Sequence, residues 1–230
     1  MTIGLKGVIF DFNGVLCWDT AEQSEAWSRY AEILRGSRLT QEEIAEHVVG
    51  RDNRYIFHYL TGKRFSGAEL AAHTEGKESI YRNLLLERGE AFRLSPGAEL
   101  LLDTLKELGV RRSIATSAGE VNLRFYFQHL HLDQWFDFNQ VVYDDDHIAT
   151  KPAPEPYQRA AAKLGLSPAE CAAVEDSRHG VQSAQAAGIG FIIALGDKSV
   201  HARLIRLPGV RLVVENLGQI PARDLFKTNP

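Results

Sequence analysis

The sequence predicts an α/β protein, with a Rossmann-like, doubly wound parallel sheet as its core and an inserted helical cap domain. Two observations predict this fold. Short apolar runs, typical of buried parallel strands, alternate with helical patterns over most of the chain. Residues 19–92 interrupt this alternation with helical patterns alone. We therefore expect the core to comprise residues 1–18 and 93–230, and the cap to comprise residues 19–92.

The composition is that of an ordinary globular protein. Of the 230 residues, 44% are hydrophobic and 24% are charged, which allows a sizeable core in one or two domains. The formal net charge of −4 gives no electrostatic reason to expect nucleic acid or a membrane as a partner. No apolar run reaches transmembrane length, and no signal-peptide pattern precedes the first strand. Cys17 and Cys171 lack metal-type spacing, so we expect reduced thiols in a cytoplasmic protein.

The first strand is expected at Val8–Phe10, and Asp11 follows it directly. Three consecutive apolar residues are typical of a strand that is buried on both faces. A carboxylate at the exit of such a strand is unfavourable unless something pairs with it. In open parallel sheets this exit is also where ligands bind. We therefore interpret Asp11 as the centre of a site, and the alternative is an ordinary turn carboxylate before Asn13–Gly14.

The region 19–92 carries several helix signals. Apolar side chains repeat at helical spacing from Trp27 onward. Thr40 with Glu43, and Ser66 with Glu69, match capping boxes ahead of apolar positions. We therefore expect an all-helical insertion.

After residue 93 the alternation of strands and helices resumes. Five further strands are expected, at Arg112–Ala115, Gln140–Tyr143, Cys171–Val174, Phe191–Leu195 and Val210–Val214. Right-handed crossovers between parallel strands carry their C-terminal ends to the same edge of the sheet. Polar residues lie at or just beyond several of these ends, namely Asp11, Thr116, Lys151, Glu175 and Asp176. We expect them to converge on one site.

Such a convergence suits phosphoryl transfer. Asp11 and Asp176 facing one cleft would repel each other unless a cation lay between them. Carboxylates without a Cys/His cluster favour a hard divalent ion, Mg²⁺ before Zn²⁺. Lys151 adds a positive charge and the Thr116 hydroxyl can donate a hydrogen bond, as a transferring phosphoryl group requires. One carboxylate is left to attack phosphorus and form an aspartyl-phosphate.

Four motifs also give the chain a resemblance to a known family. They are DFNGV at Asp11–Val15, IATS at Ile114–Ser117, KPAPEPY at Lys151–Tyr157 and VEDSRHGV at Val174–Val181. In this order, with a helical insert after the first, they resemble the haloacid dehalogenase (HAD) superfamily, close to its β-phosphoglucomutase-like branch with a C1-type helical cap. The resemblance runs from about Leu5 to Leu195.

The resemblance implies roles for the converging residues. Asp11 would be the nucleophile, and Thr116 and Lys151 would hold the phosphoryl oxygens. The loop that follows Thr116 would supply phosphate-binding amides from Ser117, Ala118 and Gly119.

The resemblance also implies a metal site and a class of substrate. Asp176 would bind Mg²⁺ together with the Asp11 carboxylate and the main-chain carbonyl of Asn13, and Glu175 would support the metal shell. The partner would be a small phosphorylated metabolite, not nucleic acid or a membrane. The sequence leaves the oligomeric state and the identity of the substrate open.

Asn13 departs from the family pattern. Phosphatases and mutases of the family usually carry an aspartate here, which serves as general acid and then as base. An amide cannot exchange protons near neutral pH, and a positioned acid/base group is worth roughly 10²–10⁴-fold in rate. The chain is therefore a disabled variant, an enzyme that uses good leaving groups or an acid from the cap, or a phosphate-ester binder with little turnover. Deamidation at Asn13–Gly14, which would restore an aspartate, is a fourth hypothesis.

We therefore expect a Mg²⁺-dependent phosphatase for a sugar-phosphate-like ester, acting through Asp11. A phosphosugar mutase is the first alternative, although the chain has Gln23 and Ser24 near the cap-hinge position where mutases of this branch tend to carry a histidine. A catalytically silent phosphate-ester-binding protein is the second. In the cap, Arg51 and Arg54 either reach a substrate anion or belong to an exposed helix start.

Overall fold

The computed structural model of the chain describes residues 4–145 and 147–226. The chain divides into two compact units, one of which joins Met1–Trp18 to Arg93–Pro230 while the other comprises Asp19–Phe92. We call them the core unit and the helical unit. No helix within the described ranges combines the length and the apolar composition that crossing a bilayer requires.

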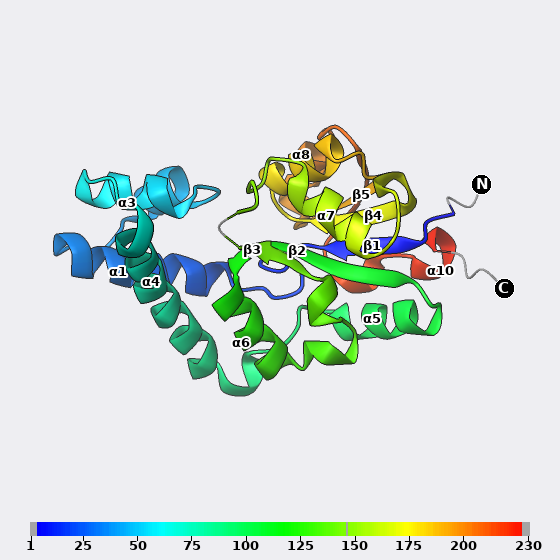
Figure 1. Cartoon of the computed structure of the whole chain (residues 1–230), viewed down its shortest axis with the longest axis horizontal. Coiled ribbons are helices and arrows are strands. Elements are labelled where there is room, and N and C mark those ends of the chain that lie inside the picture. The colour runs from blue at the N-terminus through cyan, green and yellow to red at the C-terminus, as the bar shows by residue number, and fades with distance from the viewer. Residues whose placement is uncertain (1–3, 146, 227–230) are drawn as a thin grey trace. The chain divides into compact units, whose positions relative to one another are not determined.

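The core unit is built around a parallel sheet with the strand order β3-β2-β1-β4-β5-β6 (Figure 1). In the described part of the chain its six strands are β1 (Gly7–Phe10), β2 (Arg111–Gly119), β3 (Val142–Asp144), β4 (Cys171–Glu175), β5 (Phe191–Leu195) and β6 (Val210–Val214). Every residue of β1, β4 and β5 is buried, as their continuous apolar runs predict. The parallel α/β fold expected from the alternating patterns is confirmed.

Helices cover both faces of this sheet, with α5 and α6 on one face and α7 and α8 on the other (Figure 1). The helices of the core unit are α5 (Ala98–Glu107), α6 (Glu120–Leu130), α7 (Glu155–Lys163), α8 (Arg178–Ala186), α9 (Lys198–Leu204) and α10 (Ala222–Leu225). Short 3-10 turns are η3 (Leu132–Gln134), η4 (Phe138–Gln140), η5 (Pro168–Glu170) and η6 (Leu217–Gln219). Buried side chains of α7 and α8, such as Tyr157 and Val181, pack with Ile9 and Ala173 of the sheet to form a core.

The chain reverses its direction across the sheet between β1 and β4. β2 and β3 extend from one side of β1, whereas β5 and β6 extend beyond β4. The crevice at the C-terminal ends of two such strands is the usual ligand site of an open parallel sheet. Because Phe10 is paired with Val174, the residues that follow β1 and β4 lie side by side at this point.

Strand β2 is longer than its sequence suggests. We expect a strand over Arg112–Ala115 that ends at Thr116–Ser117, but it continues to Gly119, and its register with β3 shifts between Ala115 and Gly119. The expectation of a loop over Ser117–Gly119 is therefore wrong. The prediction ended the strand where the apolar pair Ile114–Ala115 gives way to polar residues, whereas main-chain pairing with a neighbouring strand does not require apolar side chains.

The helical unit, which is described in full, contains helices and turns without a strand. Its elements are α1 (Thr20–Arg35), α2 (Gln41–Glu43), the π-helical turn η1 (Ile44–Val48), α3 (Asn53–Thr61), α4 (Gly67–Glu87) and the 3-10 turn η2 (Gly89–Ala91). Trp27, Ile56 and Phe57 are among the buried side chains that form its own hydrophobic core.

The two expected capping boxes have different outcomes. Thr40 Oγ1 accepts a hydrogen bond from the Glu43 N–H at 3.1 Å, and Glu43 Oε2 accepts one from the Thr40 N–H at 2.8 Å, which confirms the first. Ser66 precedes α4, but its side chain makes no capping hydrogen bond, so the second is wrong. Gly67 has a φ of 53°, which departs from the helical backbone that a capping box needs at its first position.

Candidate active site

Three carboxylates meet where β1 and β4 end. Asp11 follows β1, and its main-chain N–H donates to the carbonyl of Val174 at 3.0 Å. Glu175 is the last residue of β4, and Asp176 follows it. One carboxylate oxygen from each acid lies within 4.8 Å of the other two. The structure therefore brings these three expected site residues together.

Lys151 supplies the cationic group of this cluster. Its Nζ lies 3.1 Å from Asp11 Oδ1 and 2.6 Å from Glu175 Oε1, and its side chain is only 5% exposed. Tyr157 Oη donates to the same Glu175 oxygen at 2.6 Å, and the Ser177 hydroxyl donates to Oε2 at 3.3 Å. Both oxygens of the buried Glu175 are thus engaged, and this residue serves to orient Lys151.

The three carboxylates carry more negative charge than Lys151 alone can offset, and the pKa values of Asp11 and Asp176 are raised. Burial raises the pKa of Asp11 to about 7, and Glu175 adds to the rise while Lys151 opposes it. The pKa of Asp176 also lies well above its ordinary value, because of burial and then the Asp11 carboxylate. Burial alone would lower the pKa of Lys151, but the neighbouring carboxylates raise it above the ordinary value and keep the ammonium charged. A hard divalent cation on these carboxylate oxygens would offset the excess charge, so the donor set fits Mg²⁺.

Two glycines make room for the carboxylates. A Cβ at Gly14 would lie 2.0 Å from Asp176 Oδ2, and the φ of 77° at Gly14 itself disfavours any other residue. A Cβ at Gly180, in α8, would lie 1.9 Å from the Glu175 carboxyl group. Sequence reasoning missed this role, because in the sequence both look like ordinary turn and helix glycines.

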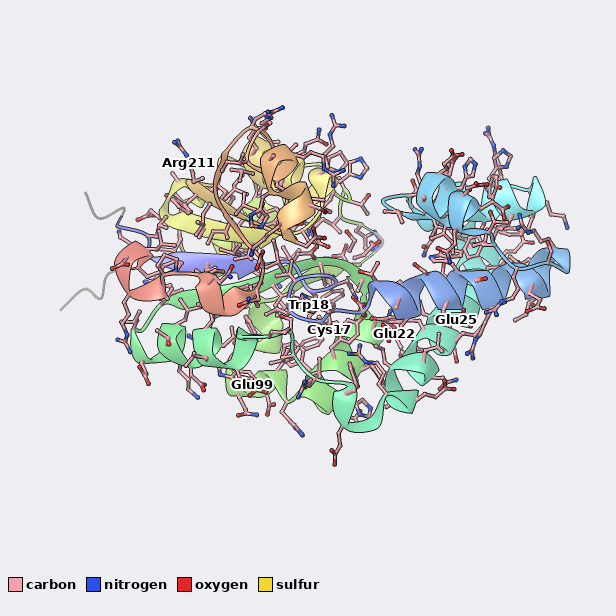
Figure 2. All side chains as sticks on the ribbon, turned by 180° about the vertical axis from the view of Figure 1, so that it is seen from behind. Cys17, Trp18, Glu22, Glu25, Glu99 and Arg211 are labelled. Carbon is pink, nitrogen blue, oxygen red and sulfur yellow. The ribbon has the colours of Figure 1, made fainter. Side chains whose placement is uncertain are left out.

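Asn13 lies in a tight loop that closes at Cys17, where the Gly14 N–H donates to the Cys17 carbonyl at 2.8 Å. Cys17 is labelled in Figure 2. Asn13 Nδ2 donates to Tyr126 Oη at 3.2 Å. The Tyr126 ring is fully buried and stacks on Phe12 with centroids 4.0 Å apart. Tyr126 therefore anchors the Asn13 side chain. Sequence reasoning missed this contact, since Tyr126 fits the apolar face of a helix.

Thr116 lies at the same edge of the sheet. The register of β1 and β2 places it one residue past the level of Asp11, and it is buried. Its Oγ1 accepts a hydrogen bond from the Ala118 N–H at 3.1 Å, so one amide that was expected to bind phosphate is engaged within the strand. Ser117 and Gly119 on either side are exposed.

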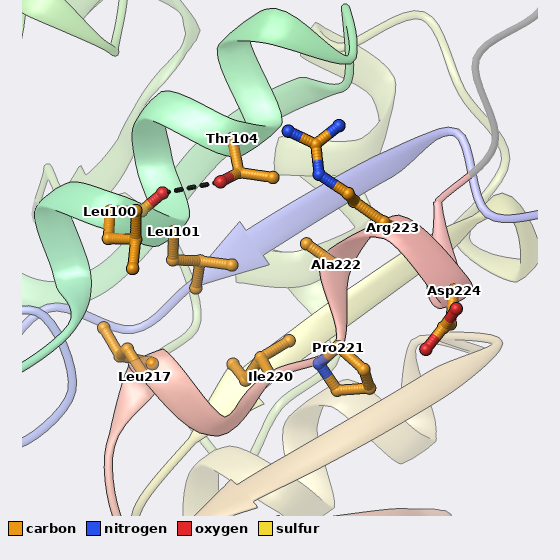
Figure 3. A pocket seen from close by; sticks show the side chains of 10 residues that line it. Leu100, Leu101, Thr104, Leu217, Ile220, Pro221, Ala222, Arg223 and Asp224 are labelled. Atoms are coloured by element: carbon orange, nitrogen blue, oxygen red, sulfur yellow. Dashed lines mark hydrogen bonds between the residues drawn. The ribbon is translucent and has the colours of Figure 1, made fainter.

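The core unit also has a pocket of about 380 Å³ that contains none of these residues. It lies between α5 and residues 217–224, and apolar side chains such as Leu101 and Ile220 line much of it (Figure 3). The Thr104 hydroxyl at its side donates to the Leu100 carbonyl at 2.8 Å. Its lining contains one acidic residue, Asp224, and no group of acids like the one at the ends of β1 and β4.

A family model for haloacid dehalogenase-like hydrolases matches residues 5–188. The chain belongs to this family. Hexitol phosphatase A of Escherichia coli (strain K12) is 32% identical over 217 residues, which cover 94% of this chain and 93% of the relative. The β-phosphoglucomutase of Bacillus subtilis (strain 168) is 29% identical over 210 residues, which cover 84% of each chain. The resemblance inferred from the four motifs is confirmed.

A solved structure extends this likeness to the whole HAD fold. The HAD hydrolase of family IA, variant 3, from Entamoeba histolytica has a TM-score of 0.88 and 31% sequence identity, and the match covers 94% of this chain and 95% of that one. The present chain is therefore a HAD-like hydrolase in sequence and in fold.

Proposed function

We propose that this HAD hydrolase cleaves a small phosphoester, using Asp11 as the nucleophile and Mg²⁺ held by Asp11 and Asp176. The observation that carries the proposal is the cluster of buried acids around Lys151 at the point where the strand order reverses. Relatives named as a hexitol phosphatase and a β-phosphoglucomutase favour a phosphorylated sugar or sugar alcohol as the substrate.

Asp11 is oriented for attack through one of its oxygens. The Phe12 N–H donates to Oδ1 at 2.7 Å, and Lys151 contacts the same atom. In our proposal Oδ2 attacks phosphorus as the ester P–O bond breaks, which gives an aspartyl-phosphate and the alcohol. Lys151 then stabilises the charge on the phosphoryl oxygens. A bound Mg²⁺ would offset the charge of these oxygens and of the carboxylates.

Proton transfer is the step that this site supports least. The leaving oxygen needs a proton, and water that attacks the aspartyl-phosphate must lose one. Asn13 can orient these groups by hydrogen bonds but cannot exchange protons. We therefore propose that turnover is slow for ordinary alcohol leaving groups, and that the main-chain carbonyl of Asn13 contributes to the metal site.

The test is release of inorganic phosphate from a panel of sugar and hexitol phosphates, in MgCl₂ and in EDTA. We expect release that requires Mg²⁺ and is lost in Asp11→Asn. Asp224→Asn is the matched control, because it removes the charge of an exposed carboxylate on α10 (Figure 3) and should retain full activity. Release that survives Asp11→Asn, or that is equally fast in EDTA, would show that the nucleophile or the metal is wrong.

Two alternatives give different outcomes with the same substrates. The β-phosphoglucomutase relative favours a mutase, which would convert a sugar phosphate into its isomer without releasing phosphate. Asn13 favours a silent phosphate-ester binder, which would bind the ester saturably and leave it intact. Analysis of the sugar phosphates by NMR separates hydrolysis, isomerisation and binding.

A further inference from the structure

The helical unit contains a pocket of about 340 Å³ whose lining includes none of the residues of the carboxylate cluster. The residues that line it come from the start of α3 and from the turn before α4, and they are Asp52, Arg54, Tyr55, His58, Arg64 and Phe65. We propose that this pocket binds a multivalent oxyanion, a phosphate or carboxylate group of a small metabolite, through Arg54 and Arg64.

The two arginines of this pocket are uncommitted. Five other arginines of the helical unit form ion pairs with carboxylates, namely Arg29, Arg35, Arg38, Arg82 and Arg88. Neither Arg54 nor Arg64 forms an ion pair with any residue in the described ranges 4–145 and 147–226. The carboxylate of Asp52 is engaged as the cap of α3, where it accepts from the Tyr55 N–H at 2.8 Å. Two guanidinium groups at one pocket with a single, engaged carboxylate favour an anion from solution.

The aromatic walls of the pocket are held in place by other side chains. Tyr55 Oη lies 2.8 Å from His47 Nδ1, and the Arg51 guanidinium lies 4.8 Å from the centre of the Tyr55 ring. Phe65 stacks on His73 with ring centres 4.2 Å apart. Because these walls are already ordered, a ligand loses little free energy in ordering them.

The local fold brings the two guanidinium groups to one place. Arg54 and His58 are four residues apart and so share a face of α3. The helix ends at Thr61 and is capped by Gly62, whose N–H donates to the His58 carbonyl at 2.8 Å. The chain then turns back and brings Arg64 to the pocket. His58 Nδ1 lies 3.3 Å from the Lys63 carbonyl, which can only accept, so His58 ties the end of α3 to the turn that carries Arg64. Guanidinium groups can grip an oxyanion with two parallel hydrogen bonds.

The test titrates the full, ¹⁵N-labelled chain in EDTA with inorganic pyrophosphate and, separately, with citrate. The Nε–Hε signals of Arg54 and Arg64, assigned with the variants Arg54→Gln and Arg64→Gln, report on this pocket and not on the carboxylate cluster. We expect saturable shifts of both signals with at least one probe, and an affinity lower by about tenfold in each variant. The probe that binds more tightly identifies the oxyanion as phosphate or carboxylate.

Arg211→Gln is the matched control, because it removes one exposed positive charge from β6 of the core unit (Figure 2). It should leave the affinity unchanged, and thermal unfolding verifies that all variants are folded. Two results would overturn the proposal. One is the absence of saturable shifts with either probe up to millimolar concentrations. The other is a loss of affinity in Arg211→Gln as large as in the pocket variants, which would indicate net charge and not a site.

Discussion

The peptide bond after Asn13 is held in a conformation that resists deamidation. The reaction requires the Gly14 nitrogen to attack the Asn13 side chain, but that nitrogen donates to the Cys17 carbonyl at 2.8 Å and the side chain is bound to Tyr126. We therefore expect Asn13 to remain an amide in the folded protein and to deamidate faster in urea. Peptide mass spectrometry of native and unfolded samples measures this, and equal rates would contradict it.

Asn13→Asp should restore the missing acid and base. We expect kcat for a sugar phosphate to rise by roughly 10²-fold or more. The gain should be smaller for an aryl phosphate, whose leaving group needs no proton. Steady-state kinetics on both substrates, with Asn139→Asp as an exposed control, measure the difference. Equal gains for the two substrates would mean that residue 13 does not act on the leaving group.

The sequence predicts individual site residues well where charge and strand position agree. Asp11, Glu175 and Asp176 all follow directly from apolar runs that end in a carboxylate, and they lie together. The contacts of Tyr157 and Tyr126 could not be predicted in this way. Both occupy apolar helix positions, and only the tertiary structure shows that their hydroxyl groups face Glu175 and Asn13.

At the scale of elements, helix α8 is packed against the carboxylate that holds Lys151. Alanine normally favours a helix over glycine by about 1 kcal/mol. We expect Gly180→Ala to gain no stability, because its Cβ would lie 1.9 Å from the Glu175 carboxyl group. The displaced Glu175 would release Lys151, so phosphate release should fall sharply.

Gln182→Ala, in the same helix, is the control for this substitution and should keep its activity. Urea unfolding and phosphate release, measured on both variants, decide the matter. A Gly180→Ala protein that is more stable than the wild type and fully active would contradict the packing that we describe.

Strand ends and caps are the elements that the sequence predicts least well. Thr116 marks the end of an apolar run, yet β2 continues to Gly119 because its main chain still pairs with β3. Ser66 and Glu69 have the spacing of a capping box, yet the backbone at Gly67 prevents it. The end of β2 and the missing cap of α4 both depend on backbone geometry, which the pattern of side chains does not predict.

At the scale of the whole molecule, the crowded carboxylates couple folding to pH and metal. The pKa of Asp11 rises from 3.8 to about 7, so between these values the native chain holds a proton that the unfolded chain has lost. Without metal, this residue therefore makes the free energy of unfolding fall as the pH rises through that range. Mg²⁺ binds the ionised form and should restore the stability above about pH 7.

Urea unfolding in EDTA and in MgCl₂ at several pH values measures this coupling. The contribution of Asp11 is the difference in the free energy of unfolding between the wild type and Asp11→Asn. In EDTA, we expect the wild type to lose stability relative to Asp11→Asn as the pH rises. In MgCl₂, we expect this loss to be smaller. A difference that does not vary with pH would contradict a raised pKa at Asp11.

The overall architecture follows from the sequence because the alternation of strands and helices is strong and regular. The parallel sheet is predicted by this alternation, and the family by the four motifs at the strand ends. The pocket at Arg54 and Arg64 does not, because it depends on how the turn after Gly62 returns beside α3.

Binding of Mn²⁺ in place of Mg²⁺, followed by electron paramagnetic resonance, tests most directly whether Asp11 and Asp176 share a cation. We expect one Mn²⁺ ion per chain, displaced by Mg²⁺, with the affinity lost in Asp176→Asn and unchanged in Asp224→Asn. Binding that is as tight in Asp176→Asn as in the wild type would contradict it.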